Sequence, residues 1–150
     1  RRAQLVNYIY DYKGIYGTSP SAVPSDHELQ QKWDKLPVAL QWSNFYCADS
    51  VDIKLRSLGF GATPPMRLTK GQIELLAEVE HNRWNMEKLL LGYRKPTPEE
   101  ELLCRDKAVR KEYKEKRFIH TDIRPYCELA EGTKDYDRCI SECLPLVVNV

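Results

Sequence analysis

Segment 69–92 places the strongest constraint on how this 150-residue chain can fold. Apolar residues recur every three or four positions along it, from Ile73 past Leu76 to Trp84, which is the spacing of one face of an α-helix. Thr69 and Gln72 have the spacing of a capping box, and Gly92 is a typical C-terminal stop. The pattern predicts one helix of about 22 residues, long enough to be packed on several sides.

Shorter helices are predicted on both sides of this segment. Their approximate ranges are 3–12, 26–36, 43–58, 97–117 and 133–146. Segments 14–25 and 59–68 are rich in Gly and Pro and are predicted to be loops, and patterns typical of strands are scarce. We therefore expect a mostly α fold: a compact helical domain with a long central helix, irregular loops and little or no strand. The loop at 59–68 suggests a division into an N-terminal linker or subdomain, 1–67, and a second domain, 68–150.

Composition and charge exclude several classes of function. The net charge of +1 creates no overall field that would attract nucleic acid or an anionic membrane. No apolar run approaches the roughly 20 residues of a membrane span. The basic stretch 105–117 alternates with acids at helical spacing, which is typical of a solvated helix face. Five irregularly spaced cysteines do not form a disulfide pattern, so a reducing, cytoplasmic location is expected.

Catalytic patterns are weak. His81 lies beside Glu80 and within two helical turns of Glu87, so an acid–base pair is conceivable at this point. A histidine that ties a helix to the following loop is the simpler interpretation. We expect a protein that is not an enzyme, and an enzyme that uses His81 or His120 is the weaker alternative.

Metal and cofactor patterns are weak as well. Cys139 and Cys143 are one helical turn apart, with Cys127 and His120 upstream, but this spacing matches no compact zinc pattern. Cysteines of this kind are commonly buried as small apolar residues. The glycines of segment 59–64 lack the third glycine and the preceding strand of a dinucleotide-binding turn. No metal and no cofactor are therefore expected.

The second half carries a series of short motifs. In order they are Glu80-His81-Asn82-Arg83-Trp84, Glu87-Lys88-Leu89-Leu90-Leu91-Gly92-Tyr93, His120-Thr121-Asp122-Ile123-Arg124-Pro125-Tyr126 with Leu129, and Lys134-Asp135-Tyr136-Asp137-Arg138. Their order and spacing over about 68–150 resemble the Ryr domain, the repeat of ryanodine receptors that also occurs as a single copy in many bacterial proteins. Tyr93 replaces the usual Trp and Thr121 the usual Pro. The resemblance implies a regulatory module that binds a ligand or a protein.

The first half is similar, more loosely, to the segment that precedes the Ryr module in bacterial proteins. The residues concerned are Trp33-Asp34-Lys35-Leu36-Pro37, Trp42-Ser43-Asn44 and 48–56. Some of those proteins carry an upstream TrkA-type NAD-binding domain, as in potassium-transport regulators. The chain begins with Arg1-Arg2 and not with Met. We therefore expect a larger parent protein whose other domains are partners of this chain, with regulation of ion transport as one implied role.

The motif residues also suggest a site by their chemistry. His81 and Trp84 share one helix face, and a pocket with aromatic walls and a basic rim would form if loop 120–126 folded back over it. The predicted ligand-binding residues are His81, Arg83, Trp84, Tyr93, His120, Asp122, Tyr126 and Arg138. Aromatic faces stack on flat rings and Arg binds phosphate with two hydrogen bonds, so a nucleotide-like ligand is the leading hypothesis.

Two alternatives stay open at this stage. The chain would be a pure protein–protein docking module if it had no small-molecule site. The same residues also fit a packed core in which His120 fastens the loop and Trp84 is buried, because aromatic residues at helical spacing usually belong to the core.

Overall fold

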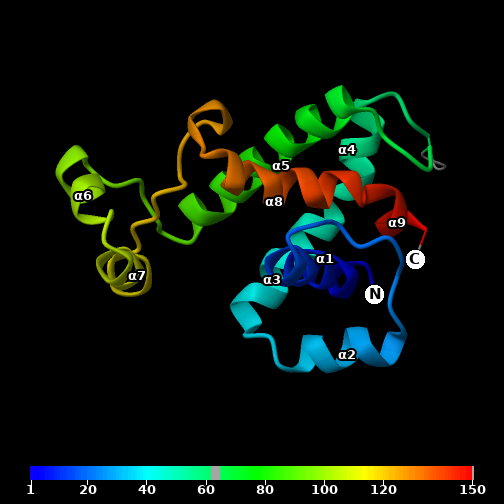
Figure 1. Cartoon of the computed structure of the whole chain (residues 1–150), viewed down its shortest axis with the longest axis horizontal. Helices are drawn as coiled ribbons and strands as arrows, with labels where there is room; N and C mark the ends of the chain where they lie inside the picture. Colours follow the sequence, from blue (N-terminus) through cyan, green and yellow to red (C-terminus); the bar gives the residue numbers. More distant parts are fainter. Residues whose placement is uncertain (62–64, 150) are drawn as a thin grey trace. The chain divides into compact units, whose positions relative to one another are not determined.

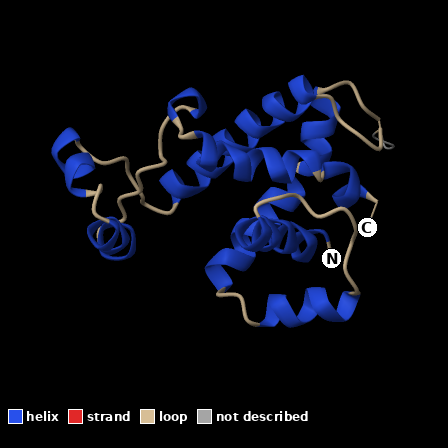
Figure 2. Cartoon of the chain, viewed as in Figure 1, coloured by secondary structure: helices blue, strands red, loops and turns tan. Residues whose placement is uncertain are grey.

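The computed structural model describes residues 1–61 and 65–149, which form helices joined by loops (Figures 1 and 2). Within these residues there is no named strand, and the β pairing is limited to one parallel bridge between Arg94 and Ile119. The predicted mostly α fold with one long helix and irregular loops is therefore confirmed. Residues 62–64, which belong to the predicted loop 59–68 and to the glycine segment 59–64, lie outside the described residues.

The helices follow one another along the chain with short connections. They are α1 (Arg2–Tyr16), α2 (Asp26–Asp34), α3 (Val38–Asp49), α4 (Val51–Ser57), α5 (Lys70–Leu90), α6 (Pro98–Leu103), α7 (Lys107–Lys116), the single 3-10 turn η1 (Tyr126–Glu128), α8 (Glu131–Glu142) and α9 (Leu144–Val148). The longest, α5, has the predicted capping box: Thr69 N donates to Gln72 Oε1 at 2.9 Å, and Gln72 N donates to Thr69 Oγ1 at 3.3 Å.

Packing divides the chain into two compact units. Unit 1 comprises residues 1–80 and 132–150, and unit 2 comprises residues 81–131, so the division falls inside α5. It differs from the predicted division into 1–67 and 68–150. The reason is that the C-terminal helix α9 packs against α1 and α4, which returns the end of the chain to the core of unit 1.

Unit 1 is built around one apolar core. Helix α1 packs against α2, α3 and α9, and it buries Leu5, Val6 and Ile9. Helix α8 lies alongside the first half of α5 (Figure 1), where Arg138 donates to both carboxylate oxygens of Glu74 at 2.7 and 2.9 Å. Unit 1 therefore gains its stability mainly from the removal of apolar side chains from water.

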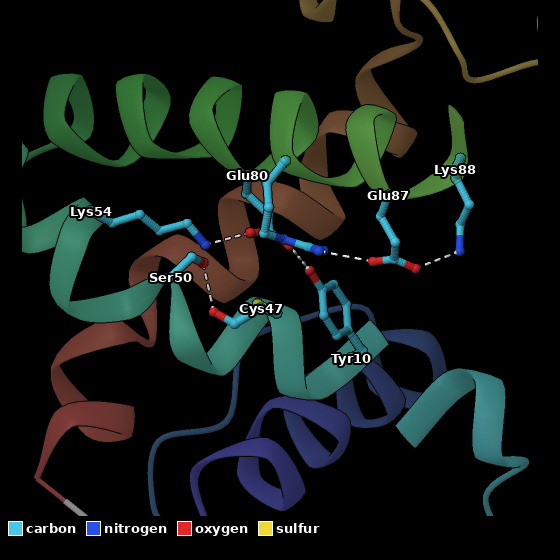
Figure 3. Close-up of polar contacts among 8 residues, drawn as sticks. Tyr10, Cys47, Ser50, Lys54, Glu80, Glu87 and Lys88 are labelled. Atoms are coloured by element: carbon cyan, nitrogen blue, oxygen red, sulfur yellow. Dashed lines mark hydrogen bonds and ion pairs between the residues drawn. The ribbon is translucent and has the colours of Figure 1, made fainter. Parts of the chain in front are cut away.

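One ion pair is buried in the core of unit 1. The Lys54 side chain of α4 is 2% exposed and the Glu80 side chain of α5 is 1% exposed, and the two form a salt bridge (Figure 3). The Tyr10 hydroxyl of α1 donates to the second oxygen of Glu80 at 3.3 Å. Charges this deeply buried need such partners, because an unpaired charge away from water is costly.

Several predicted helix ends are wrong, and local side chains explain why. The first helix continues past Gly14 and ends at Gly17, whose φ of 72° closes it in the left-handed conformation. The predicted helix 43–58 is divided into α3 and α4 at Ser50, whose hydroxyl donates to the carbonyl of Cys47 at 2.7 Å. The predicted helix 97–117 is also two helices, because the Asp106 carboxylate accepts two backbone N–H groups and starts α7.

Candidate functional site

Loop 120–126 folds over α5 in the way that the sequence suggested. The Nε2–H of His81 donates to the carbonyl oxygen of Arg124 at 2.8 Å, and Asn85 Nδ2 donates to the same oxygen at 3.0 Å. The His81 side chain is buried, with 2% of the residue exposed, and its ring centroid lies 6.0 Å from that of Tyr126. Because the Nε2 proton is engaged by a backbone carbonyl, His81 holds the loop in place.

A cluster of rings surrounds this anchor, and we call it the aromatic cluster. Its members are His81, Trp84, Tyr93, Phe118, His120 and Tyr126, and each ring centroid lies 4.8–6.4 Å from a neighbour. His81 stacks on Trp84, and Trp84 meets His120 edge to face at 4.8 Å. These separations are typical of rings in direct contact, so His81 and Tyr126 form a packed interior.

The cluster has a partly exposed edge. Trp84, Tyr93 and His120 are half-buried, and Phe118 is 49% exposed. Phe118 has a φ of 55°, which is the only positive φ at a residue other than glycine among the described residues. For a bulky side chain this conformation costs roughly 1–2 kcal/mol. The bridge next to it, where Arg94 N donates to the carbonyl of Phe118 at 2.9 Å, holds the backbone in this conformation.

His120 is neutral at pH 7. Its Nδ1 accepts the backbone N–H of Asp122 at 3.2 Å, so the proton of the neutral ring lies on Nε2. Burial lowers the pKa of His120 to about 4; the Asp122 carboxylate opposes this shift, and the charges of Lys114, Lys88 and Arg110 add to it. Three cations therefore act on this edge of the aromatic cluster.

The three cations come from two helices. The ammonium of Lys88 lies 5.5 Å from the centroid of the Trp84 ring and also pairs with Glu87 at 2.9 Å (Figure 3). Arg110 and Lys114 are four residues apart on α7, so they share one face, and both are exposed. Neither side chain makes an ion pair or hydrogen bond with another described residue. Their positive charge is therefore not neutralised by a carboxylate, and it helps to lower the pKa of His120.

The predicted site residues are only partly brought together. His81, Trp84, Tyr93, His120, Asp122 and Tyr126 all lie around the aromatic cluster of unit 2. Arg83 pairs with the buried carboxylate of Glu87 at 2.8 Å. Arg138 belongs to unit 1, where its guanidinium is bound by Glu74 and Asp135. The two arginines predicted as a basic rim therefore serve as ion-pair partners.

Four residues at the exposed edge of the aromatic cluster were not predicted from the sequence: Lys88, Arg110, Lys114 and Phe118. Lys88 follows Trp84 by one helical turn, and Arg110 and Lys114 lie in the stretch 105–117 that was interpreted as a solvated helix face. The sequence shows the i, i+4 spacing of Trp84 with Lys88 and of Arg110 with Lys114. It does not show where these cations lie relative to the aromatic cluster. Nothing in the sequence indicates the backbone conformation of Phe118.

The described residues do not form a metal site or a membrane-spanning helix. Among residues 1–61 and 65–149, no group of three or more His, Cys, Asp or Glu side chains is arranged to hold a metal ion. Cys139 is buried on α8, Cys143 is buried between α8 and α9, and Cys127 is exposed. Of the helices described, none combines the length and the apolar character that crossing a membrane requires.

Comparison with known proteins adds no relative: no protein-family model, curated protein or solved structure matches the chain.

Proposed function

We propose that this chain is a non-enzymatic binding module of the Ryr type, and that the exposed edge of the aromatic cluster takes a nucleotide-like ligand. The observation that carries the proposal is the Lys88 ammonium, which lies 5.5 Å from the centroid of the half-buried Trp84 ring; the exposed Arg110 and Lys114 add positive charge that lowers the pKa of His120. Positive charge beside a half-buried ring matches a ligand that has both a flat ring and a phosphate.

Each part of such a ligand has a counterpart. The rings of Trp84, Tyr93 and Phe118 offer apolar faces and edges on which a base can pack. The guanidinium of Arg110 can bind a phosphate with two hydrogen bonds, and Lys114 adds a point charge. Because these cations are exposed, their attraction is screened over about 8 Å at physiological ionic strength, so binding should weaken as salt increases.

Both histidines support binding over catalysis. His81 donates its Nε2 proton to a backbone carbonyl, and His120 accepts a backbone N–H at Nδ1. A general base works best when its pKa is near the working pH, whereas the pKa of His120 is about 4. Both rings are therefore suited to holding loop 120–126. As a module of a larger cytoplasmic protein, the chain would report the presence of its ligand to neighbouring domains, one of which regulates ion transport.

Thermal unfolding of the chain with ATP or NAD at about 1 mM tests the proposal, with inorganic phosphate as a comparison. We expect the nucleotides to raise the melting temperature, because a ligand that binds only the folded state stabilises it. No shift with any nucleotide would contradict the proposal and favour the pure docking module.

A matched pair of variants locates the site. Arg110→Glu/Lys114→Glu should weaken nucleotide binding at least about tenfold, which corresponds to about 1.4 kcal/mol. Lys107→Glu/Lys111→Glu makes the same change of charge at the same spacing on α7, at positions other than the two that lower the pKa of His120. It should leave binding within about twofold. Equal losses in both variants would show that only the overall charge matters and would overturn the assigned site.

A further inference from the structure

Unit 2 also contains an open groove of about 720 Å³. One wall is the segment that leads into α6, with Pro96 and Pro98, and the other is the segment before η1, with Ile123 and Pro125. The size falls within the roughly 300–1,000 Å³ of ordinary ligand sites. None of the eight predicted ligand-binding residues lines this groove, although Ile123, Arg124 and Pro125 belong to loop 120–126.

The first wall is held rigidly by its own side chains. The Arg94 guanidinium donates to both carboxylate oxygens of Glu100 at 2.7 Å each. Glu100 also accepts the backbone N–H of Thr97, completing a capping box at the start of α6. The guanidinium and the backbone N–H hold the pKa of Glu100 down at about 2, so this carboxylate stays charged at all ordinary pH values.

The second wall is held by Arg124. Its Nε donates to the carbonyl of Thr121 at 2.6 Å and its Nη2 donates to Glu101 at 2.7 Å, while His81 and Asn85 bind its carbonyl oxygen. Both walls are therefore already ordered in the free chain, so binding should cost little further conformational entropy.

The first wall offers a free backbone donor. Arg94 uses both its N–H, to the carbonyl of Phe118, and its carbonyl, to the N–H of His120, in the bridge with loop 118–120. In a paired extended segment the next residue directs its groups to the opposite edge. The N–H of Lys95 thus points away from the bridge, and no described residue accepts it. An added extended chain can accept this hydrogen bond, as in strand addition.

Charge is unbalanced at two points of the groove. Arg94 and Arg124 are neutralised by Glu100 and Glu101. Lys95 on the first wall and Glu128 on the second are exposed, and neither makes an ion pair with another described residue. The groove therefore presents one positive and one negative side chain on facing walls, between proline surfaces.

We propose that this groove binds an extended segment of a partner protein that carries one acidic residue, for Lys95, and one basic residue, for Glu128. The acidic and the basic residue are separated along the segment, because Lys95 and Glu128 lie on different walls of the groove. Apolar residues between them pack on the exposed rings of Pro98 and Pro125, behind which Pro96 and Ile123 are buried. This site is independent of the proposed nucleotide site.

Selection of a phage-displayed heptapeptide library on the full chain tests the proposal. We expect enriched peptides to contain both an acidic and a basic residue. The synthetic consensus peptide should bind in fluorescence anisotropy and should bind at least about tenfold more weakly to Lys95→Glu. A peptide with its acid replaced by Lys should bind Lys95→Glu better than it binds the unmodified chain. Lys107→Glu, on α7 and outside the groove, is the matched control and should bind like the unmodified chain.

Three results would overturn the proposal: no enrichment, enrichment without the paired charges, or equal affinity of the consensus peptide for the Lys95→Glu variant and the unmodified chain. Far-UV circular dichroism checks that each variant is folded. The nucleotide-induced rise in melting temperature should persist in Lys95→Glu. Whether or not the peptide binds, the nucleotide-induced rise in melting temperature can therefore be tested on its own.

Discussion

The two units of this chain are stabilised by different interactions. Unit 1 buries a continuous apolar core, to which α1, α3, α4, α8 and α9 all contribute. Unit 2 has a small cluster of Cys104, Tyr113 and Ile119 and also buries Ile123, Tyr126 and Leu129, and it adds ring contacts, helix caps and ion pairs. The burial of apolar side chains stabilises a fold but is not directional, whereas hydrogen bonds and edge-to-face ring contacts fix the orientation of the groups that make them. We therefore expect unit 1 to dominate stability and unit 2 to carry the binding surfaces and to open locally at lower free energy.

The largest effect should come from the buried charge of unit 1. Glu80→Ala would leave the Lys54 ammonium buried without its carboxylate, so the free energy of unfolding should fall by about 3–5 kcal/mol. Urea denaturation of the variant and of the unmodified chain measures this difference in the free energy of unfolding.

The control is a more exposed pair in the same unit, between Lys32 and Asp11. Asp11→Ala should cost under about 1 kcal/mol. The double variant Lys54→Met/Glu80→Leu should recover most of the loss, because apolar residues of similar size often replace a buried pair without cost. Similar costs for Glu80→Ala and Asp11→Ala would refute the special role of burial.

A smaller and more local effect is expected in unit 2. His81→Ala removes a buried ring and one of the two donors to the Arg124 carbonyl, at a cost of about 2–3 kcal/mol. Amide hydrogen exchange should accelerate at residues 120–126, while protection in α1 and α3 is retained. His27→Ala, at an exposed histidine of α2, is the control and should leave exchange in the loop unchanged. Uniform acceleration throughout the chain would mean that the two units unfold together.

The smallest effect is the pH dependence that His120 introduces. Burial holds its pKa at about 4 in the folded chain, below the ordinary value of 6.5. Between these values the unfolded chain binds more protons, so stability falls as pH falls from 6.5 to 4. The loss should be on the order of 1–2 kcal/mol after allowance for solvent screening. His120→Gln should reduce this slope in thermal unfolding; an unchanged slope in His120→Gln would show that burial does not lower the pKa of this ring.

The candidate site could be predicted in part. The pairing of His81 with Trp84 follows from helical spacing alone, whereas the sequence offered the covering of these residues by loop 120–126 only as a condition for a pocket. Arg83 and Arg138 were expected on a basic rim, but each is bound by nearby carboxylates. A guanidinium can serve a ligand or a carboxylate equally well, and the sequence does not show which partner is within reach.

Features that depend on a few neighbouring residues could be predicted from the sequence. These include the mostly helical fold, the long helix α5 and its capping box at Thr69, because helical periodicity and capping act over about one turn. Features that join distant segments became visible only in the folded chain: the pair of Lys54 with Glu80, the return of α9 to unit 1, and the groove beside Pro96 and Pro125. Contacts of this kind depend on which faces meet after the helices pack, and no local pattern records that choice.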